Sequence, residues 1–96
     1  MVFKEISVKK VMIFKKKNCA PCQALTDSID SYTGKDLDDV DLFYADMSKP
    51  DDETVELSVK YNVRSAPTTV IVDEKGTVIY SGTMVRTVED LINKMK

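Results

Sequence analysis

The sequence predicts an α/β fold in which a central mixed sheet is flanked by helices on both faces. Strand-like and helix-like segments alternate in the order β-α-β-α-β-β-α, and such alternation is typical of parallel strands joined by right-handed helical crossovers. The last two strand-like segments are separated only by a short turn, which indicates an antiparallel edge. Because the chain has 96 residues, no repeat and no Gly/Ser linker, we expect one domain spanning residues 1–96.

The first expected strand runs from Val8 to about Phe14. Residues 11–14 within it are all apolar, and a continuous apolar run is typical of a strand that is buried on both faces. This strand should therefore lie in the middle of the sheet. We expect residues 1–7 to form a short edge strand.

The first expected helix runs from Cys19 to about Thr33, because its apolar side chains share one helical face. Those side chains are Leu25, Ile29 and Tyr32. Pro21 is tolerated because it falls in the first turn, where backbone N–H groups have no intrahelical acceptor. Gly34 is expected to end the helix in the left-handed conformation.

A second strand and a second helix are expected in the middle of the chain. The strand is Val40–Asp46, in which positions 40, 42 and 44 share one face and positions 43 and 45 the other. Residues 48–53 combine a proline with three acids, which indicates the N-terminus of a helix. We expect this helix to end at about Tyr61, with Asn62 as its cap.

The last part of the chain predicts a hairpin followed by a helix. Every residue from 68 to 72 is β-branched, which favours a strand. The turn 73–76, Asp-Glu-Lys-Gly, should lead into an antiparallel partner, Thr77–Ser81. Thr87 opens the last helix, with Asp90 three residues later in a capping-box pattern. The apolar face of that helix consists of Val88, Leu91, Ile92 and Met95.

Composition and charge disfavour several classes of function. Lys and Arg number 14 and Asp and Glu 16, so the net charge is −2 and binding to nucleic acid is disfavoured. The run Val11–Phe14 is far too short for a membrane span or a signal-peptide core. We therefore expect no membrane association, and a cytoplasmic location for a chain that starts at Met1 without an apolar leader.

The chain has no histidine and two cysteines, Cys19 and Cys22, which are spaced C-x-x-C. A Ser-His or Cys-His catalytic pair is therefore impossible, and two cysteines are too few for a closed zinc site, so no metal is expected. In an intracellular protein such a pair is more often catalytic than structural. At a helix N-terminus the backbone N–H groups and the helix dipole favour the thiolate of Cys19, and Cys22 follows one turn later, within reach of a disulfide.

Other interpretations of this segment stay open. The cysteines can be a redox-inert pair or two small apolar residues of the core. A soft-metal chaperone or a bridging iron–sulfur role also uses C-x-x-C, although Pro21 stiffens what should be a flexible clamp. The lysine run 15–17 either provides a positive field for the thiolate or an anionic partner, or simply solvates the end of the strand.

Several segments, in the right order, resemble the thioredoxin family. The apolar run 11–14 leads into Cys19-Ala20-Pro21-Cys22, and residues 60–68, Lys-Tyr-Asn-Val-Arg-Ser-Ala-Pro-Thr, resemble the family's cis-proline segment. The hairpin 70–76 and Gly82 follow as they do in thioredoxins, so the resemblance covers roughly residues 8–96. It implies a thioredoxin-like fold with a shortened N-terminus, because only 18 residues precede Cys19, as in glutaredoxins and minimal thioredoxins.

The resemblance also implies roles for individual residues. Cys19 would be the attacking thiol and Cys22 the resolving thiol of a redox-active disulfide, with no other cofactor. A cis peptide bond would join Ala66 to Pro67 beside the dithiol, and the backbone before Pro67 would pair with an extended substrate. The implied substrate-binding residues are Asn18, Ala20, Pro21, Ala66 and Pro67.

The chain also departs from the family's pattern. Asn18 stands where thioredoxins usually have Trp, and Ala20 replaces Gly in their usual Gly-Pro pair. Ile13 and Leu42 take the places of a buried Asp and an opposing Lys. Losing both charges together leaves no unpaired buried ion, so folding need not suffer, but it removes the expected proton acceptor for Cys22.

These features predict a monomeric thiol–disulfide oxidoreductase of electron transport and cell redox homeostasis that mainly reduces protein disulfides. The expected partners are protein disulfide substrates and, as electron donor, thioredoxin reductase or glutathione. A glutathione-dependent glutaredoxin-type enzyme is the nearest alternative. A protein-binding subunit that uses the cis-proline groove without turnover is an alternative from another class.

Overall fold

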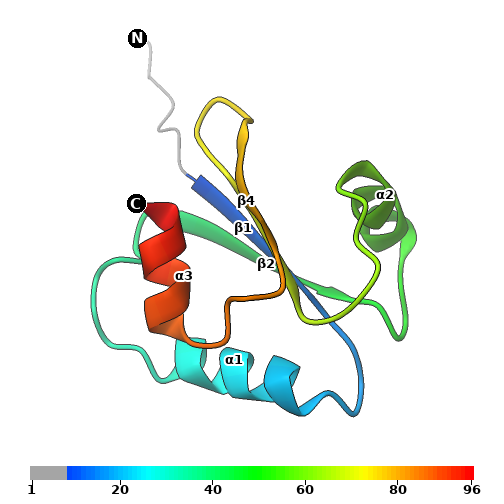
Figure 1. Cartoon of the computed structure of the whole chain (residues 1–96), viewed down its shortest axis with the longest axis horizontal. Helices are drawn as coiled ribbons and strands as arrows, with labels where there is room; N and C mark the ends of the chain where they lie inside the picture. Colours follow the sequence, from blue (N-terminus) through cyan, green and yellow to red (C-terminus); the bar gives the residue numbers. More distant parts are fainter. Residues whose placement is uncertain (1–8) are drawn as a thin grey trace, which may run out of the picture.

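A computed structural model describes residues 9–96, which form a four-stranded mixed sheet flanked by three helices (Figure 1). The elements are β1 (Lys9–Lys15), α1 (Ala20–Asp30), β2 (Val40–Asp46), α2 (Asp52–Lys60), β3 (Thr68–Val72), β4 (Val78–Gly82) and α3 (Val88–Met95). The predicted order β-α-β-α-β-β-α is confirmed. The edge strand expected over residues 1–7 lies outside the described residues, as does Val8.

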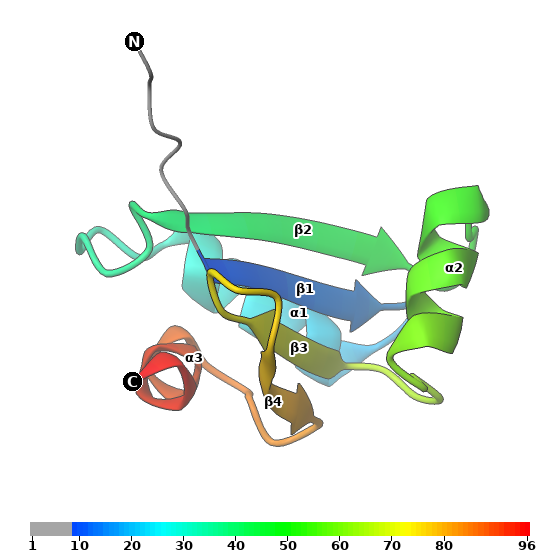
Figure 2. The same cartoon turned by 90° about the horizontal axis from the view of Figure 1, so that it is seen from above.

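The strands lie in the order β2-β1-β3-β4 across the sheet (Figure 2). β1 is parallel to β2 and antiparallel to β3, and the hairpin β3–β4 supplies the antiparallel edge. β1 is therefore central, and its residues 11–14 are at most 4% exposed. The continuous apolar run thus marks a strand buried on both faces, as predicted.

Two cores lie on opposite faces of the sheet. Val11 and Ile13 of β1 belong to the core under α1 and α3, whereas Met12 and Phe14 belong to the core on the side of α2. Figure 1 shows the same division, with α2 on one side of the strands and α1 and α3 on the other. Successive side chains of β1 point alternately into the two cores, so every residue from 11 to 14 is buried and apolar.

Side-chain and backbone caps fix the ends of the second and third helices. The Asp51 carboxylate accepts a hydrogen bond from the Thr54 N–H at 2.8 Å and begins α2. At the other end Asn62 has φ 56°, and the Val63 N–H donates to the Ser58 carbonyl at 2.8 Å, which is a Schellman arrangement. The predicted capping box of α3 is also confirmed, because Thr87 and Asp90 exchange hydrogen bonds of 3.2 Å in each direction.

Several element boundaries differ from the sequence prediction by one to three residues, and two of the differences have a clear physical reason. α1 ends at Asp30 rather than near Thr33, and Gly34 is not left-handed: Gly76 is the one glycine of residues 9–96 with a positive φ. The Tyr32 side chain packs over Gly34 and donates to the Asp36 carboxylate, so a Cβ at position 34 would meet the Tyr32 ring. Gly34 therefore allows the Tyr32 ring to lie close to the backbone, and it does not end the helix in the left-handed conformation.

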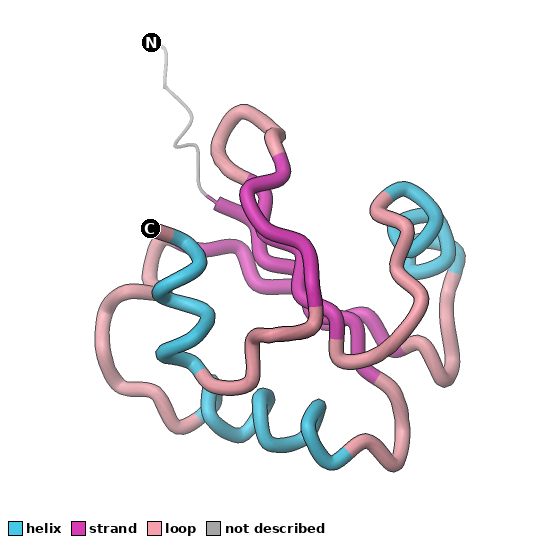
Figure 3. Tube along the Cα trace, viewed as in Figure 1, coloured by secondary structure: helices cyan, strands magenta, loops and turns pink. Residues whose placement is uncertain are grey.

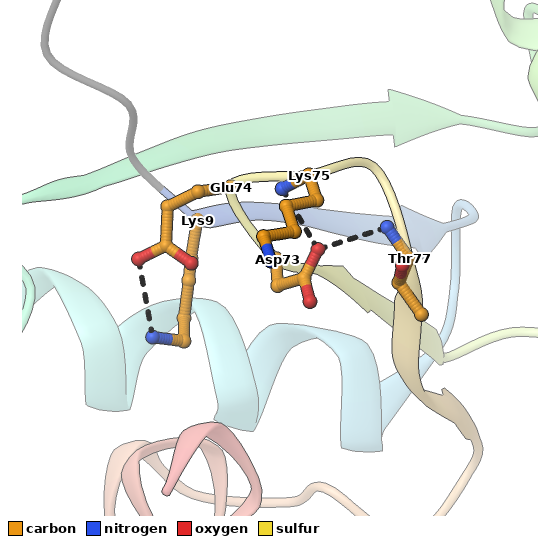
Figure 4. Close-up of polar contacts among 5 residues, drawn as sticks. All are labelled: Lys9, Asp73, Glu74, Lys75 and Thr77. Atoms are coloured by element: carbon orange, nitrogen blue, oxygen red, sulfur yellow. Dashed lines mark hydrogen bonds and ion pairs between the residues drawn. The ribbon is translucent and has the colours of Figure 1, made fainter.

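The second difference is that β4 begins at Val78, one residue later than expected, because Thr77 belongs to the hairpin turn (Figure 4). The Asp73 carboxylate accepts from the backbone N–H groups of Lys75 and Thr77, each at 2.9 Å, and Gly76 has φ 88°. These hydrogen bonds hold the pKa of Asp73 below its usual value, the Thr77 N–H contributing most. The Glu74 carboxylate lies 3.7 Å from the Lys9 ammonium, which ties the turn to β1.

Candidate active site

The two cysteines lie at the N-terminus of α1 and form a disulfide in this structure, with Cα atoms 5.2 Å apart. Cys19 is the N-cap residue, and its sulfur accepts a hydrogen bond from the Cys22 N–H at 3.2 Å. Cys22 is 3% exposed, whereas Cys19 is only half-buried. The two sulfurs are therefore unequal in access, and Cys19 is the one that a large partner can approach.

The chain around the cysteines enters α1 through a sharp turn. Asn18 has φ 56°, a left-handed conformation that asparagine adopts more readily than most residues. Pro21 then occupies the first turn of the helix, as predicted. The first helical hydrogen bond runs from the Gln23 N–H to the Cys19 carbonyl at 3.0 Å. The pair is thus held on a regular helix rather than on a free loop.

The β1–α1 loop and the β2–α2 loop leave the same end of the sheet (Figure 3), and hydrogen bonds between the two segments hold the β1–α1 loop in place. The Lys17 N–H donates to the Ser48 hydroxyl at 2.7 Å, and the Met47 N–H donates to the Lys15 carbonyl at 2.7 Å. The Asp46 carboxylate in turn accepts from the Ser48 N–H at 2.9 Å. Residues distant in sequence therefore fix the segment that carries Cys19.

The cysteines open onto a cleft of about 630 Å³. It lies where the parallel strands β1 and β2 both end, which is the edge of α/β sheets where functional sites are usual. Its lining comes from the end of β1, the following loop, the N-terminal part of α1 and the end of β2. The lining residues are Lys15, Lys16, Lys17, Asn18, Cys19, Ala20, Cys22, Gln23, Thr26 and Asp46.

The charges in the cleft are mostly positive. Three lysines and one aspartate line it, while the chain as a whole has a net charge of −2. Residues 9–96 contain one salt bridge, which joins Lys9 to Glu74. None of the three cleft lysines is therefore neutralised by an ion pair within this range. A positive cleft at a helix N-terminus favours the ionised form of a thiol placed in it.

Tyr44 lies beside this positive region. The Lys15 ammonium is 5.0 Å from the centre of the Tyr44 ring, a cation–π distance. The Tyr44 hydroxyl is buried and has no hydrogen-bond partner among the described residues. Burial raises the pKa of Tyr44, and the Asp30 carboxylate raises it further. The phenol is therefore neutral at ordinary pH and adds no charge to the site.

The structure brings four of the seven expected site residues to the cleft, namely Asn18, Cys19, Ala20 and Cys22. Pro21, Ala66 and Pro67, all within the described range, are not part of its lining. The peptide bond between Ala66 and Pro67 is cis, as the family resemblance implies. Pro67 is buried, and it directly precedes β3 at the end of the sheet where β1 stops, because Phe14 pairs with Thr68.

Three cleft residues were not identified from the sequence. Gln23 and Thr26 lie four and seven residues after Cys19, so helical spacing could have placed them on its face. The Thr26 hydroxyl donates to the Cys22 carbonyl at 2.9 Å. Asp46 ends a strand parallel to β1 and pairs in register with Lys15, which the expected β-α-β order could have indicated.

Ile13 and Leu42, which replace the family's charged pair, lie in the core beneath α1 and α3. Ile13 is fully buried, and Leu42 is half-buried and packs against the same core. Elsewhere in residues 9–96, no three His, Cys, Asp or Glu side chains gather as metal ligands do. In the same range, none of the helices has the length and apolar character needed to cross a bilayer.

Comparisons with known proteins agree with this architecture. Solved structures with similar folds include StoA from Bacillus subtilis (TM-score 0.71, 22% identity, 96% of this chain and 85% of that one). Thioredoxin 1 from Thermosipho africanus is also similar, with a TM-score of 0.65 and 23% identity over 90% of this chain and 89% of that one. A disulphide isomerase from Xylella fastidiosa has a TM-score of 0.70 and 21% identity over 93% of this chain and 79% of that one. No curated protein sequence matches the chain. The family model of the thioredoxin-like domain matches residues 2–96, so the chain belongs to that family.

Proposed function

We propose that this protein is a thiol–disulfide oxidoreductase that mainly reduces protein disulfides. The observation that carries the proposal is the unequal access of two bonded sulfurs at a helix N-terminus: Cys19 is half-buried at the cleft, and Cys22 is 3% exposed behind it. Such a pair can attack a large substrate with one sulfur and release it with the other. A redox-inert structural pair gives no reason for an open, positive cleft in front of Cys19.

In the reduced protein the Cys19 thiolate attacks one sulfur of the substrate disulfide. A bond forms between Cys19 and that sulfur, the substrate S–S bond breaks, and the leaving thiolate takes a proton from water. Cys22 then loses its proton and attacks the Cys19 sulfur, which breaks the mixed disulfide. The second substrate thiolate leaves and is protonated. Two electrons thus pass from the protein to the substrate, and the two new substrate thiols take up one proton from water and the equivalent of the proton that Cys22 released.

The order of attack follows from the local hydrogen bonding and access. The Cys19 sulfur accepts the Cys22 N–H at 3.2 Å and lies at the positive end of α1, so its thiolate is stabilised. The Cys22 sulfur is buried, which disfavours its ionised form. Cys19 is therefore the attacking thiol and Cys22 the resolving one.

Several further features belong to this proposal. The substrate segment would lie beside Asn18, Ala20 and Pro21 and pair with the backbone that precedes the cis bond at Ala66 and Pro67. Thioredoxin reductase or glutathione would restore the dithiol, with no other cofactor. We propose that the protein acts as a monomer in the cytoplasm, within electron transport and cell redox homeostasis.

Mixed-disulfide trapping tests the assigned order. Cys22→Ser should accumulate a covalent adduct with a disulfide-bonded peptide on Cys19, because nothing resolves it, whereas the matched Cys19→Ser should accumulate little. Limiting iodoacetamide should likewise label Cys19 before Cys22 in the reduced wild type. Mass spectrometry identifies the labelled cysteine in each case, and predominant labelling of Cys22 would contradict the order of attack.

Turnover with defined donors separates the reductase from its alternatives. NADPH consumption with thioredoxin reductase and a protein disulfide is expected. Turnover with glutathione alone would instead favour the glutaredoxin-type enzyme. A non-catalytic binding subunit would show no turnover with either donor. It would also bind the substrate equally well as the wild type and as the double variant Cys19→Ser/Cys22→Ser.

A further inference from the structure

The lysine run before the first cysteine faces the same space as the dithiol. Lys15, Lys16 and Lys17 all line the cleft that holds Cys19 and Cys22. Lys16 and Lys17 are exposed, while Lys15 is half-buried with its ammonium over the Tyr44 ring. From this placement we propose that the site selects disulfide substrates that carry carboxylates close to the disulfide, a selectivity that rests on the reductase function proposed above.

The positive charge of the cleft is local and is not cancelled by neighbours. The lining has three lysines against one acid, Asp46, which gives it a formal charge of +2 in a chain of net −2. Among residues 9–96 the one salt bridge involves Lys9 and lies in the hairpin region. A general surface excess of lysine therefore does not explain the cleft, because the molecule as a whole is acidic.

The geometry of the reaction brings substrate charges within range of these lysines. The substrate sulfur must reach Cys19, and Lys17 and Lys16 precede Cys19 by two and three residues. Residues of an extended substrate are about 3.3 Å apart, so groups two or three positions from its disulfide lie about 7 to 10 Å from the Cys19 sulfur, at the mouth of the cleft that the lysines line. The Debye length at 0.1 M salt is also about 10 Å. Carboxylates there are attracted by the cleft, and ammonium groups are repelled.

Hydrogen bonds to the β2–α2 loop anchor the backbone that carries these lysines. The Lys17 N–H is bound to the Ser48 hydroxyl and the Lys15 carbonyl to the Met47 N–H, so the loop is anchored at both ends of the run. The backbone that carries the three ammonium groups is thereby held beside Cys19. This arrangement can act on the rate of encounter, which oppositely charged surfaces raise by about 10-fold to 1,000-fold at low salt.

A second effect of the same lysines has to be separated from selectivity. Positive charge also favours the Cys19 thiolate and so changes its reactivity toward every substrate alike. Selectivity appears instead in the ratio of rates for two substrates that differ only in flanking charge. That ratio is unaffected by the thiolate fraction, because both substrates meet the same thiol.

The experiment measures second-order rate constants for oxidation of the pre-reduced protein by three disulfides, so that no donor enzyme is required. Two are synthetic peptides of equal length with Asp or Lys flanking one disulfide, and the third is glutathione disulfide. The double variant Lys16→Glu/Lys17→Glu is compared with Lys35→Glu/Lys96→Glu, whose exposed positions lie outside the cleft lining. Each pair lowers the formal net charge of −2 by four, so the two variants differ only in where the charge lies.

The wild type and the control variant should oxidise about 10-fold faster with the acidic peptide than with the basic one at low salt. That preference should disappear at about 1 M salt, where the Debye length is near 3 Å. In Lys16→Glu/Lys17→Glu the preference should be lost or reversed. The rate with glutathione disulfide, relative to the acidic peptide, identifies whether the favoured carboxylates come from a small tripeptide or from a protein segment.

Two results would overturn the selectivity while leaving the reductase intact. One is a measurable rate with no preference between the peptides in the wild type. The other is a preference that survives in Lys16→Glu/Lys17→Glu. If both peptides and iodoacetamide alkylation are slowed equally in that variant, the lysines act on the thiolate alone. Failure of every disulfide to oxidise the dithiol would overturn both the selectivity and the proposed function.

Discussion

Replacing Ile13 by Asp restores the acid that related thioredoxins carry in the core, and we expect it to destabilise this protein strongly. Ile13 is fully buried between the sheet and the helices α1 and α3. Leu42, where the family has a lysine, is apolar and packs against the same core. A carboxylate introduced here therefore meets no opposing charge from β2.

The expected cost has two parts that respond differently to pH. Removing the isoleucine side chain costs about 2–5 kcal/mol at any pH, as for other large-to-small changes in cores. Burial also raises the pKa of the new carboxyl group, and a rise of about three units costs about 4 kcal/mol at neutral pH. The unfolded chain ionises near pH 4 and the folded chain only at higher pH, so stability falls as pH rises between those two values.

Urea unfolding at about pH 4, 5.5 and 7 measures both parts, with Ile13→Asn as the matched control. Asn has nearly the size of Asp and cannot ionise, so the two variants should be about equally stable at the lowest pH. Ile13→Asp should then lose about 4 kcal/mol relative to Ile13→Asn by pH 7. Ile13→Val, which keeps the core apolar, should cost about 0.5–1.5 kcal/mol.

An Asp–Asn difference that stays flat with pH would refute this reasoning, because the carboxylate would then be solvated or paired. The nearest candidate for such pairing is Lys15, two residues along on the same face of β1, whose ammonium lies over Tyr44. Adding Leu42→Lys to Ile13→Asp should recover about 1–3 kcal/mol through a buried pair. Ile13 pairs with Tyr44 and Leu42 with Val11, so positions 13 and 42 are diagonal neighbours on adjacent strands. No recovery would mean that the two new side chains do not reach each other across this diagonal.

Three smaller changes test other parts of the structure. Tyr44→Phe removes a buried hydroxyl that has no partner, so urea unfolding should show unchanged stability or a gain of up to about 1 kcal/mol, and a larger loss would reveal a missed hydrogen bond. Asn62→Gly should be tolerated, whereas Asn62→Val should cost about 1–2 kcal/mol, because residue 62 has φ 56°. The hydrogen bond from the Thr77 N–H lowers the pKa of Asp73. The free energy of unfolding of the wild type should therefore exceed that of Asp73→Asn by a full margin above about pH 4, and this margin should shrink as the pH falls further. A margin independent of pH would contradict the assigned cause.

Most of the fold could be predicted because its signals are local. The continuous apolar run at 11–14, the β-branched run at 68–72 and the Thr87–Asp90 capping box each specify an element by themselves, and all three are confirmed. The sequence prediction is wrong where tertiary contacts decide the local conformation. A glycine just after a helical pattern usually marks the end of a helix. Gly34 is instead required because the Tyr32 side chain packs where a Cβ at position 34 would lie.

The candidate site was less predictable, because only part of it is contiguous in sequence. The segment from Lys15 to Cys22 could be read directly, but Asp46 reaches the cleft only through the register of two parallel strands. Lys15 pairs with Asp46, and the Met47 N–H closes that end of the ladder on the Lys15 carbonyl at 2.7 Å. A slip of one residue would turn Asp46 to the other face of the sheet, and lysines would then be the only charged residues in the lining of the cleft. The charge that a substrate meets at Cys19 is therefore set by strand pairing as much as by the lysine run itself.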